Sequence, residues 1–294
     1  MLVIAISSRT LFDLDAAHEV FRKQGVDAYR AYQLERENDI LEPGVAFPLV
    51  QKLLNIRHPH NAEPLVEVVL ISRNNGDTGL RIFNSIEHYG LPIHRAAFSN
   101  GQPPYAYLSA FGVHLFLSAH FSDVKKTLEA GHAAAHFKTR NTQMPTDQQV
   151  RIAFDGDAVI FSDESEAIYQ KEGLEAFKDN EHKYAKEPLN PGPFKSFLIA
   201  LHELQTVFPN DEAPLRTALV TARSAPSHKR VILTLREWGV RIDEALFLGG
   251  HDKSAFLKSF NADIFFEDQL AYVQSAYLDT ATGHVPYGVT NQDN

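Results

Sequence analysis

An internal repeat is the feature that most limits how this chain can fold. At an offset of 149 positions, glycines fall on glycines and apolar residues fall on residues of the same type. The matching pairs are Gly90 and Gly239, Ile93 and Ile242, Phe98 and Phe247, Gly101 and Gly250, Leu108 and Leu257, and Val124 and Val273. Further upstream the offset is 148, where Gly25 falls on Gly173 and Pro43-Gly44 on Pro191-Gly192. A nearly constant offset over such a span predicts a duplicated structural unit.

Short apolar runs alternate with longer amphipathic stretches in both copies of the repeat. The runs cover residues 2–6, 66–71, 113–117, 150–154, 218–220, 245–248 and 264–266. Strands that are buried on both faces of a parallel sheet have this composition. The sequence therefore predicts an α/β fold of two tandem Rossmann-like units, each a parallel sheet flanked by helices. We place the units at residues 1–145 and 146–294, joined by the polar segment 139–149.

Composition narrows the class of protein. A chain of 294 residues with 44% hydrophobic residues can form buried cores in two domains. The formal charge of -9 argues against nucleic acid as a main partner, because phosphate backbones are bound through clustered lysines and arginines. The absence of cysteine excludes disulfides and thiol nucleophiles. The apolar run at residues 2–6 is too short for a signal peptide or a membrane span, so we expect a cytoplasmic protein with no membrane partner.

Two carboxylates directly follow one apolar run. Asp155 and Asp157 come after residues 150–154, at the carboxyl end of a predicted strand, where ligands bind in open α/β sheets. Gly156 permits the turn that brings both carboxylates to one pocket. An aspartate that attacks phosphorus forms an aspartyl-phosphate, and a second carboxyl group can protonate the leaving oxygen and then deprotonate water. Two carboxylates facing a phosphate require a cation, and Mg²⁺ is suited to oxygen ligands.

Later strand ends carry groups that complete such a site. Thr221, which follows residues 218–220, offers a hydroxyl group to a phosphate oxygen, and Lys253 offers a point charge. Residues 264–266 lead into Glu267 and Asp268. Asp268 is the predicted third metal ligand beside Asp155 and Asp157, whereas Glu267 is predicted to orient the metal's waters. Each group alone is typical of a turn or a helix cap. Their combined order and strand-end placement favour a catalytic site.

This order of groups resembles the haloacid dehalogenase-like superfamily. Longer segments are similar to the cytosolic type I 5'-nucleotidase family, namely residues 4–9, 153–166, 219–224, 243–248 and 284–288. The resemblance implies Mg²⁺-dependent hydrolysis of nucleoside 5'-monophosphates, AMP in particular, with a small helical cap inserted at about 163–213. We expect substrate contacts from Gly156, Ala222, Arg223 and Ser224. Glu267 stands where the family pattern has an aspartate, so the resemblance does not fix which carboxylates bind the metal directly.

The repeat also predicts that the first copy is catalytically silent. Ser7 stands opposite Asp155, Arg9 opposite Asp157, Pro104 opposite Lys253, and Ser118-Ala119 opposite Glu267-Asp268. The first copy then braces the second, dimerises or helps to bind substrate, so a homo-oligomer is an open alternative. The segment Ser7-Ser8-Arg9 has two interpretations. Either it holds a phosphate-like group, or Arg9 pairs with a carboxylate between the copies.

Two other functions compete with a nucleotide phosphatase. One is a phosphatase of the same superfamily that acts on another small ester, such as a sugar phosphate. The other is a nucleotide-binding regulatory protein with vestigial hydrolysis, against which the retained Asp155, Asp157, Thr221 and Lys253 speak. The expected partner in the favoured interpretation is a small nucleotide substrate.

Overall fold

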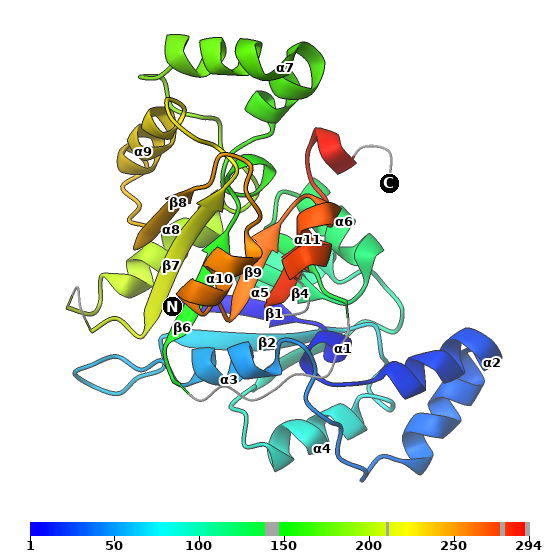
Figure 1. The fold of residues 1–294 in the computed structure, drawn as a ribbon. Helices are drawn as coiled ribbons and strands as arrows, with labels where there is room; N and C mark the ends of the chain where they lie inside the picture. The colour runs from blue at the N-terminus through cyan, green and yellow to red at the C-terminus, as the bar shows by residue number, and fades with distance from the viewer. Residues whose placement is uncertain (139–146, 210–211, 277–279, 292–294) are drawn as a thin grey trace. The chain divides into compact units, whose positions relative to one another are not determined.

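The computed structural model describes residues 1–138, 147–209, 212–276 and 280–291, and it has the predicted α/β architecture of parallel strands flanked by helices (Figure 1). The chain forms two compact units. The first comprises Met1–Ala130 and His136–Gln148, and the second comprises Gly131–Ala135 and Gln149–Asn294. The short strand β5 (Ala134–His136) falls where the two units divide. The predicted linker lies mostly outside the described residues.

The first unit has a parallel sheet with the strand order β3-β2-β1-β4. The central strand pairs Ile4 with Val68 on one side and with Leu115 on the other. Every residue of this strand is buried, as the apolar run predicted. The elements are β1 (Leu2–Ile6), α1 (Ser8–Leu11), α2 (Asp15–Glu35), α3 (Phe47–Leu54), β2 (Val66–Ser72), α4 (Leu80–His88), β3 (Arg95–Phe98), α5 (Tyr105–Phe111), β4 (Leu115–Ser118) and α6 (Phe121–Glu129).

The second unit has a parallel sheet with the strand order β8-β7-β6-β9-β10. Its central strand pairs Phe154 with Leu219 on one side and with Phe266 on the other. The elements are β6 (Val150–Phe154), the π-turn η1 (Gly156–Ile160), α7 (Glu164–Lys183), α8 (Lys195–Gln205), β7 (Leu215–Thr221), α9 (His228–Glu237), β8 (Glu244–Phe247), α10 (Ser254–Phe260), β9 (Ile264–Glu267), α11 (Leu270–Ala276), β10 (Ala281–His284) and the 3-10 turn η2 (Val289–Asn291).

Helix α8 packs in the core of the second unit. Phe197 of α8 and the preceding Phe194 are fully buried, and both rings contact Phe154 and Phe266 at centroid distances of 4.8–6.3 Å. Burying one such side chain stabilises the fold by roughly 1.5–3 kcal/mol. Within the segment 163–213 that we predict as a cap, α8 therefore contributes its apolar residues to the core that covers the sheet. Helix α7 stands apart from the strands of its unit (Figure 1).

Several local features occur in both units at corresponding positions. Helix α2 bends at Gly25 and α7 bends at Gly173, with φ of 86° and 84°, values that favour glycine. Isolated antiparallel bridges join Phe12 to Pro43 in the first unit and Phe161 to Pro191 in the second. The proline is followed by Gly192 in the second unit, and a Cβ at that glycine would lie 2.3 Å from the Phe161 carbonyl oxygen. The approach of these backbones therefore requires glycine.

Among the helices of the described residues, none combines the length and the apolar character that crossing a lipid bilayer requires.

Candidate active site

The loop after β6 carries the first predicted catalytic group. Asp155 follows the buried strand with an extended backbone, and its N–H donates to the Phe266 carbonyl on the neighbouring strand (2.8 Å). The chain then turns through η1, where Ala158 has a φ of 60°. A Cβ at Gly156 would lie 3.2 Å from Thr221 Oγ1, so this glycine lets the loop pass close to the end of β7. The carboxyl ends of β6, β7 and β9 thus come together in one place.

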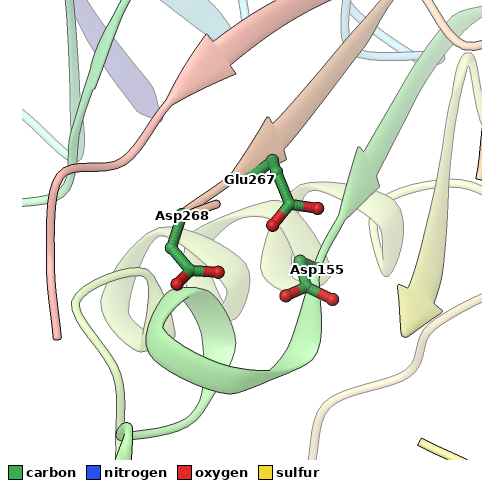
Figure 2. Close-up of side chains that lie close together, drawn as sticks. All are labelled: Asp155, Glu267 and Asp268. Atoms are coloured by element: carbon green, nitrogen blue, oxygen red, sulfur yellow. The ribbon is translucent and has the colours of Figure 1, made fainter. Parts of the chain in front are cut away.

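Three buried carboxylates cluster at this edge of the second sheet. Asp155 follows β6, whereas Glu267 ends β9 and Asp268 comes directly after it. Each contributes an oxygen, and these oxygens all lie within 4.8 Å of one another. Figure 2 shows the three side chains lying close together at the ends of their strands. Because parallel strands end at the same edge of a sheet, residues more than a hundred positions apart form one acidic cluster.

Lys253 is the cation that contacts this cluster. Its Nζ donates to Asp155 Oδ1 (2.8 Å) and to Glu267 Oε2 (2.7 Å), and the side chain is 2% exposed. Burial alone would lower the pKa of Lys253, but Asp155 and Glu267 outweigh it and raise the pKa. Lys253 therefore remains an ammonium group inside the protein.

The carboxyl groups are correspondingly perturbed. Burial raises the pKa of Asp155 to about 7, although Lys253 acts in the opposite direction. Burial also raises the pKa of Asp268 well above its usual range, with further contributions from the charges of Glu267 and Asp155. One ammonium group, in contact with Asp155 and Glu267, does not balance the charge of three clustered carboxyl groups, and a bound cation would supply the missing positive charge.

The hydrogen bonds at the acidic pair leave one oxygen available. Glu267 Oε1 accepts from the Gln269 N–H (3.0 Å), and its Oε2 accepts from Lys253. Asp268 Oδ2 accepts from the Thr290 hydroxyl (2.8 Å), whereas its Oδ1 is buried and has no hydrogen-bond partner among the described residues. An all-oxygen donor set with an unsatisfied carboxylate oxygen fits a hard divalent cation such as Mg²⁺.

Asp157 belongs to a second ionic network, beside the acidic cluster. Arg223 donates from Nε and Nη2 to the two oxygens of Asp157 (2.8 and 2.6 Å) and from Nη1 to Glu181 (2.5 Å). Arg230 donates to the other oxygen of Glu181 (3.0 Å). Burial acts to lower the pKa of Arg223, but Asp157 and Glu181 outweigh it and raise the pKa. Asp155 and Asp157 are two residues apart in the chain, so the two networks adjoin each other.

The remaining predicted residues lie at the end of β7 and in the loop after it. Thr221 is buried, and its Oγ1 accepts from the Arg223 N–H (3.2 Å). Ala222 and Ser224 are exposed, on either side of buried Arg223. Arg223, predicted to bind substrate, directs all three of its guanidinium nitrogens to carboxylates. Its side chain is therefore placed to fix the orientation of Asp157.

Sequence reasoning missed several members of these networks. Glu181 and Arg230 lie on helices among many other charged residues, so no local pattern distinguishes them. Thr290, close to the end of the described chain, follows a segment noted only for its family resemblance. His284 in that segment contacts the Asp268 carbonyl oxygen through Nε2 (3.0 Å). Repeat alignment offers a weak signal for Glu181, because the buried polar residue Gln33 stands opposite it at the offset of 148.

The fold and the site together define a class: α/β proteins with a lysine-linked acidic cluster at the carboxyl ends of parallel strands. Comparison with known families then places the chain. The profile of the 5'-nucleotidase family matches residues 1–292, so the chain belongs to the 5'-nucleotidase family. The family resemblance seen in the sequence is thereby confirmed.

Comparison with individual proteins gives a further match. Cytosolic 5'-nucleotidase 1B from Homo sapiens is 40% identical over 287 residues, covering 94% of this chain and 47% of that protein. The chain thus spans about half the length of this curated relative. A solved histidinol dehydrogenase from Elizabethkingia anophelis aligns over 96% of this chain and 79% of its own, with 9% identity and a TM-score of 0.25. A score that low carries no argument about fold.

Proposed function

We propose that this chain is a Mg²⁺-dependent phosphatase that hydrolyses nucleoside 5'-monophosphates, with AMP as the favoured substrate, in the cytosol. The observation that carries the proposal is the buried cluster of Asp155, Glu267 and Asp268 joined by Lys253, in a chain of the 5'-nucleotidase family. A site of this kind binds a cation and a phosphate together, because the cation offsets the repulsion between carboxylates and the phosphate dianion.

The proposed roles follow from the position of each group. Asp155 attacks the phosphorus atom and forms an aspartyl-phosphate, and Asp157 protonates the ribose 5' oxygen and later deprotonates water. Arg223 holds Asp157 through its two-point contact, which makes it a positioning residue. Thr221 and Lys253 contact phosphate oxygens. Gly156, Ala222 and Ser224 line the approach of the phosphate to the loop.

Asp155, Asp268 and the Asp157 backbone carbonyl are the proposed protein ligands of the metal. Asp268 Oδ1 is the group best placed to accept it, since that oxygen is buried without a donor in the described part of the chain. Bound Mg²⁺ would neutralise charge on the transferred phosphoryl group. Glu267, whose two oxygens are already engaged by Lys253 and Gln269, is proposed to stay outside the ligand shell and to orient the metal's waters.

We further propose that the hydrolytic reaction belongs to residues 146–294 and that residues 1–145 form a related unit without it. The strand orders β3-β2-β1-β4 and β8-β7-β6-β9 correspond one to one, which supports a duplication. Ser7 stands at the position of Asp155, and Ser118 and Ala119 stand at those of Glu267 and Asp268. Helix α7 is the part of the second unit proposed as a cap.

Phosphate release from a substrate panel tests this proposal. The full chain is assayed with AMP, other nucleoside monophosphates, ribose 5-phosphate and glucose 6-phosphate, each with Mg²⁺ and with EDTA. We expect Mg²⁺-dependent release that is fastest with a nucleoside monophosphate. Faster turnover of a sugar phosphate would favour the alternative ester, and nucleotide binding without any release would favour a regulatory protein.

A further inference from the structure

The first unit contains a cavity of about 480 Å³ that the proposed reaction does not use. It lies at the carboxyl ends of three strands, because its walls include Ser7 after β1, Ser72 at the end of β2 and Ser118 at the end of β4. Cavities of roughly 300–1,000 Å³ are typical of sites for small organic ligands. Ligands of open α/β sheets bind at this edge.

The position of the cavity corresponds to that of the acidic cluster in the second unit. Ser7 follows the central strand of its sheet as Asp155 follows the central strand of the other. Ser72 ends β2 as Thr221 ends β7, and Ser118 ends β4 as Glu267 ends β9. The first unit therefore retains a pocket where the second has its candidate catalytic site, but the carboxylates have been replaced.

The residues lining this cavity are suited to an anion. Three arginines, Arg9, Arg30 and Arg73, line it together with two aspartates, Asp27 and Asp123. Each arginine also pairs with a carboxylate, and these partners are Asp15, Asp77 and Asp123. Arg73 is bound to Asp123 and also donates to the Gly101 carbonyl oxygen (2.9 Å). The side chains of Arg9 and Arg73 are 27% and 34% exposed, so a ligand in the cavity can reach their guanidinium groups.

Two buried donors at this cavity have no acceptor in the described part of the chain. They are Nε of Arg9 and Nδ2 of Asn74, and both residues line the cavity. An unsatisfied buried donor costs about 1–3 kcal/mol, and an acceptor brought by a ligand removes that cost. Burial and then the nearby Arg9 lower the pKa of His18, a further lining residue, which is consistent with positive potential at this wall.

An aromatic wall adjoins the arginines. Phe21 lines the cavity and is 47% exposed, although a phenylalanine ring gains free energy by burial. His18 stacks on it at a centroid distance of 6.2 Å, and Tyr29 meets it edge-on at 6.0 Å. Val26, also lining, is 65% exposed. This uncovered apolar surface offers a flat face to a planar ring.

We propose that this cavity binds a nucleotide, with its phosphate at Arg9 and Arg73 and its base at Phe21 and His18, and holds it without hydrolysis. The two halves of such a ligand match the two walls: a phosphate makes charge-assisted hydrogen bonds with arginine, and a base stacks on an aromatic ring. Hydrolysis is excluded there because Ser7 replaces the nucleophile and Ser118 and Ala119 replace the acidic pair. The site is distinct from the proposed catalytic site.

Equilibrium binding to the full chain tests the proposal. The background is Asp155→Asn, which prevents turnover of the probe, and the probes are AMP, adenosine, ribose 5-phosphate and inorganic phosphate. We expect two AMP molecules per chain. Arg9→Ala should weaken one of the two sites about 10- to 100-fold, the effect of removing a charge-assisted hydrogen bond. Because Arg9 and Asp15 form a partly exposed pair, this change should leave the fold intact.

Two further variants separate the proposal from weaker explanations. Arg22→Ala is the matched control, since Arg22 is exposed, pairs with Glu19 and does not line the cavity. Phe21→Ala should weaken AMP at the same site while leaving inorganic phosphate unchanged.

Three outcomes would overturn the proposal. They are AMP binding that Phe21→Ala leaves unchanged at every site, equal effects of Arg9→Ala and Arg22→Ala, or inorganic phosphate binding as tightly as AMP at the site that depends on Arg9. Because the readout is binding to a chain without its nucleophile, failure of the proposed hydrolysis would leave this result interpretable.

Discussion

Replacing Lys253 with methionine should destabilise the second unit strongly. The ammonium group lies 2.8 Å from Asp155 and 2.7 Å from Glu267, and all three side chains are at most 7% exposed. Methionine preserves most of the volume but leaves two buried carboxylates without their cation. Removing one partner of a buried ion pair costs about 3–5 kcal/mol. At a typical urea dependence of about 2–3 kcal/mol per molar, the unfolding midpoint should fall by roughly 1–2.5 M.

Urea unfolding in EDTA measures this effect, with Lys258→Met as the control. Lys258 is exposed on α10, the helix that directly follows Lys253, so its replacement changes the charge without breaking a buried ion pair. The free energy of unfolding of Lys258→Met should stay within about 0.5 kcal/mol of that of the unmodified protein. Equal midpoints for the two variants would refute the view that Lys253 is the electrostatic centre of the acidic cluster. Added Mg²⁺ should restore part of the loss in Lys253→Met.

Three further changes test other parts of the account. Mg²⁺ at about 100 times its dissociation constant should stabilise the protein by about 2.7 kcal/mol in thermal unfolding, and Asp268→Asn should abolish the gain; an unchanged gain would remove Asp268 from the metal site. Arg223→Lys should lower kcat about 10- to 100-fold with little change in KM, because lysine cannot hold Asp157 at two points; a KM effect alone would assign Arg223 to substrate binding. Gly192→Ala should lower the free energy of unfolding in urea by about 1–3 kcal/mol, because its Cβ would meet the Phe161 carbonyl oxygen. Gly76→Ala, which has open space around it, should leave that free energy nearly unchanged. Similar losses in the two variants would show that the close approach at Gly192 is unimportant.

The fold was predictable from the sequence where burial alone decides the pattern. Strands β1 and β6 are central in parallel sheets and nearly continuously apolar, so their residues predict both the strand and the burial of its two faces. The predicted cap at 163–213 rests on the family resemblance and on the length of the segment, and neither separates α8 from α7. The buried Phe197 of α8 and the preceding Phe194 could equally have been taken as a core pattern, and their contacts with Phe154 and Phe266 depend on tertiary packing.

The candidate site was predictable as far as strand ends could locate it. Asp155, Glu267 and Asp268 follow apolar runs, and strand ends in a parallel sheet share one edge, so their convergence could be expected. The network of Arg223, Glu181 and Asp157 could not, because it joins a strand-end loop to the last turn of a long polar helix. Side-chain direction on that helix depends on the bend at Gly173, which no periodicity reveals.

The rate of phosphate release from AMP by the Asp155→Asn variant tests the central claim most directly. Asp39→Asn serves as the control, since Asp39 is an exposed aspartate of the first unit. With Mg²⁺ present, the account predicts that Asp155→Asn loses at least about 1,000-fold in rate while Asp39→Asn retains the rate of the unmodified protein. Undiminished release by Asp155→Asn would contradict the account, because the reaction would then not use the carboxylate at the end of β6.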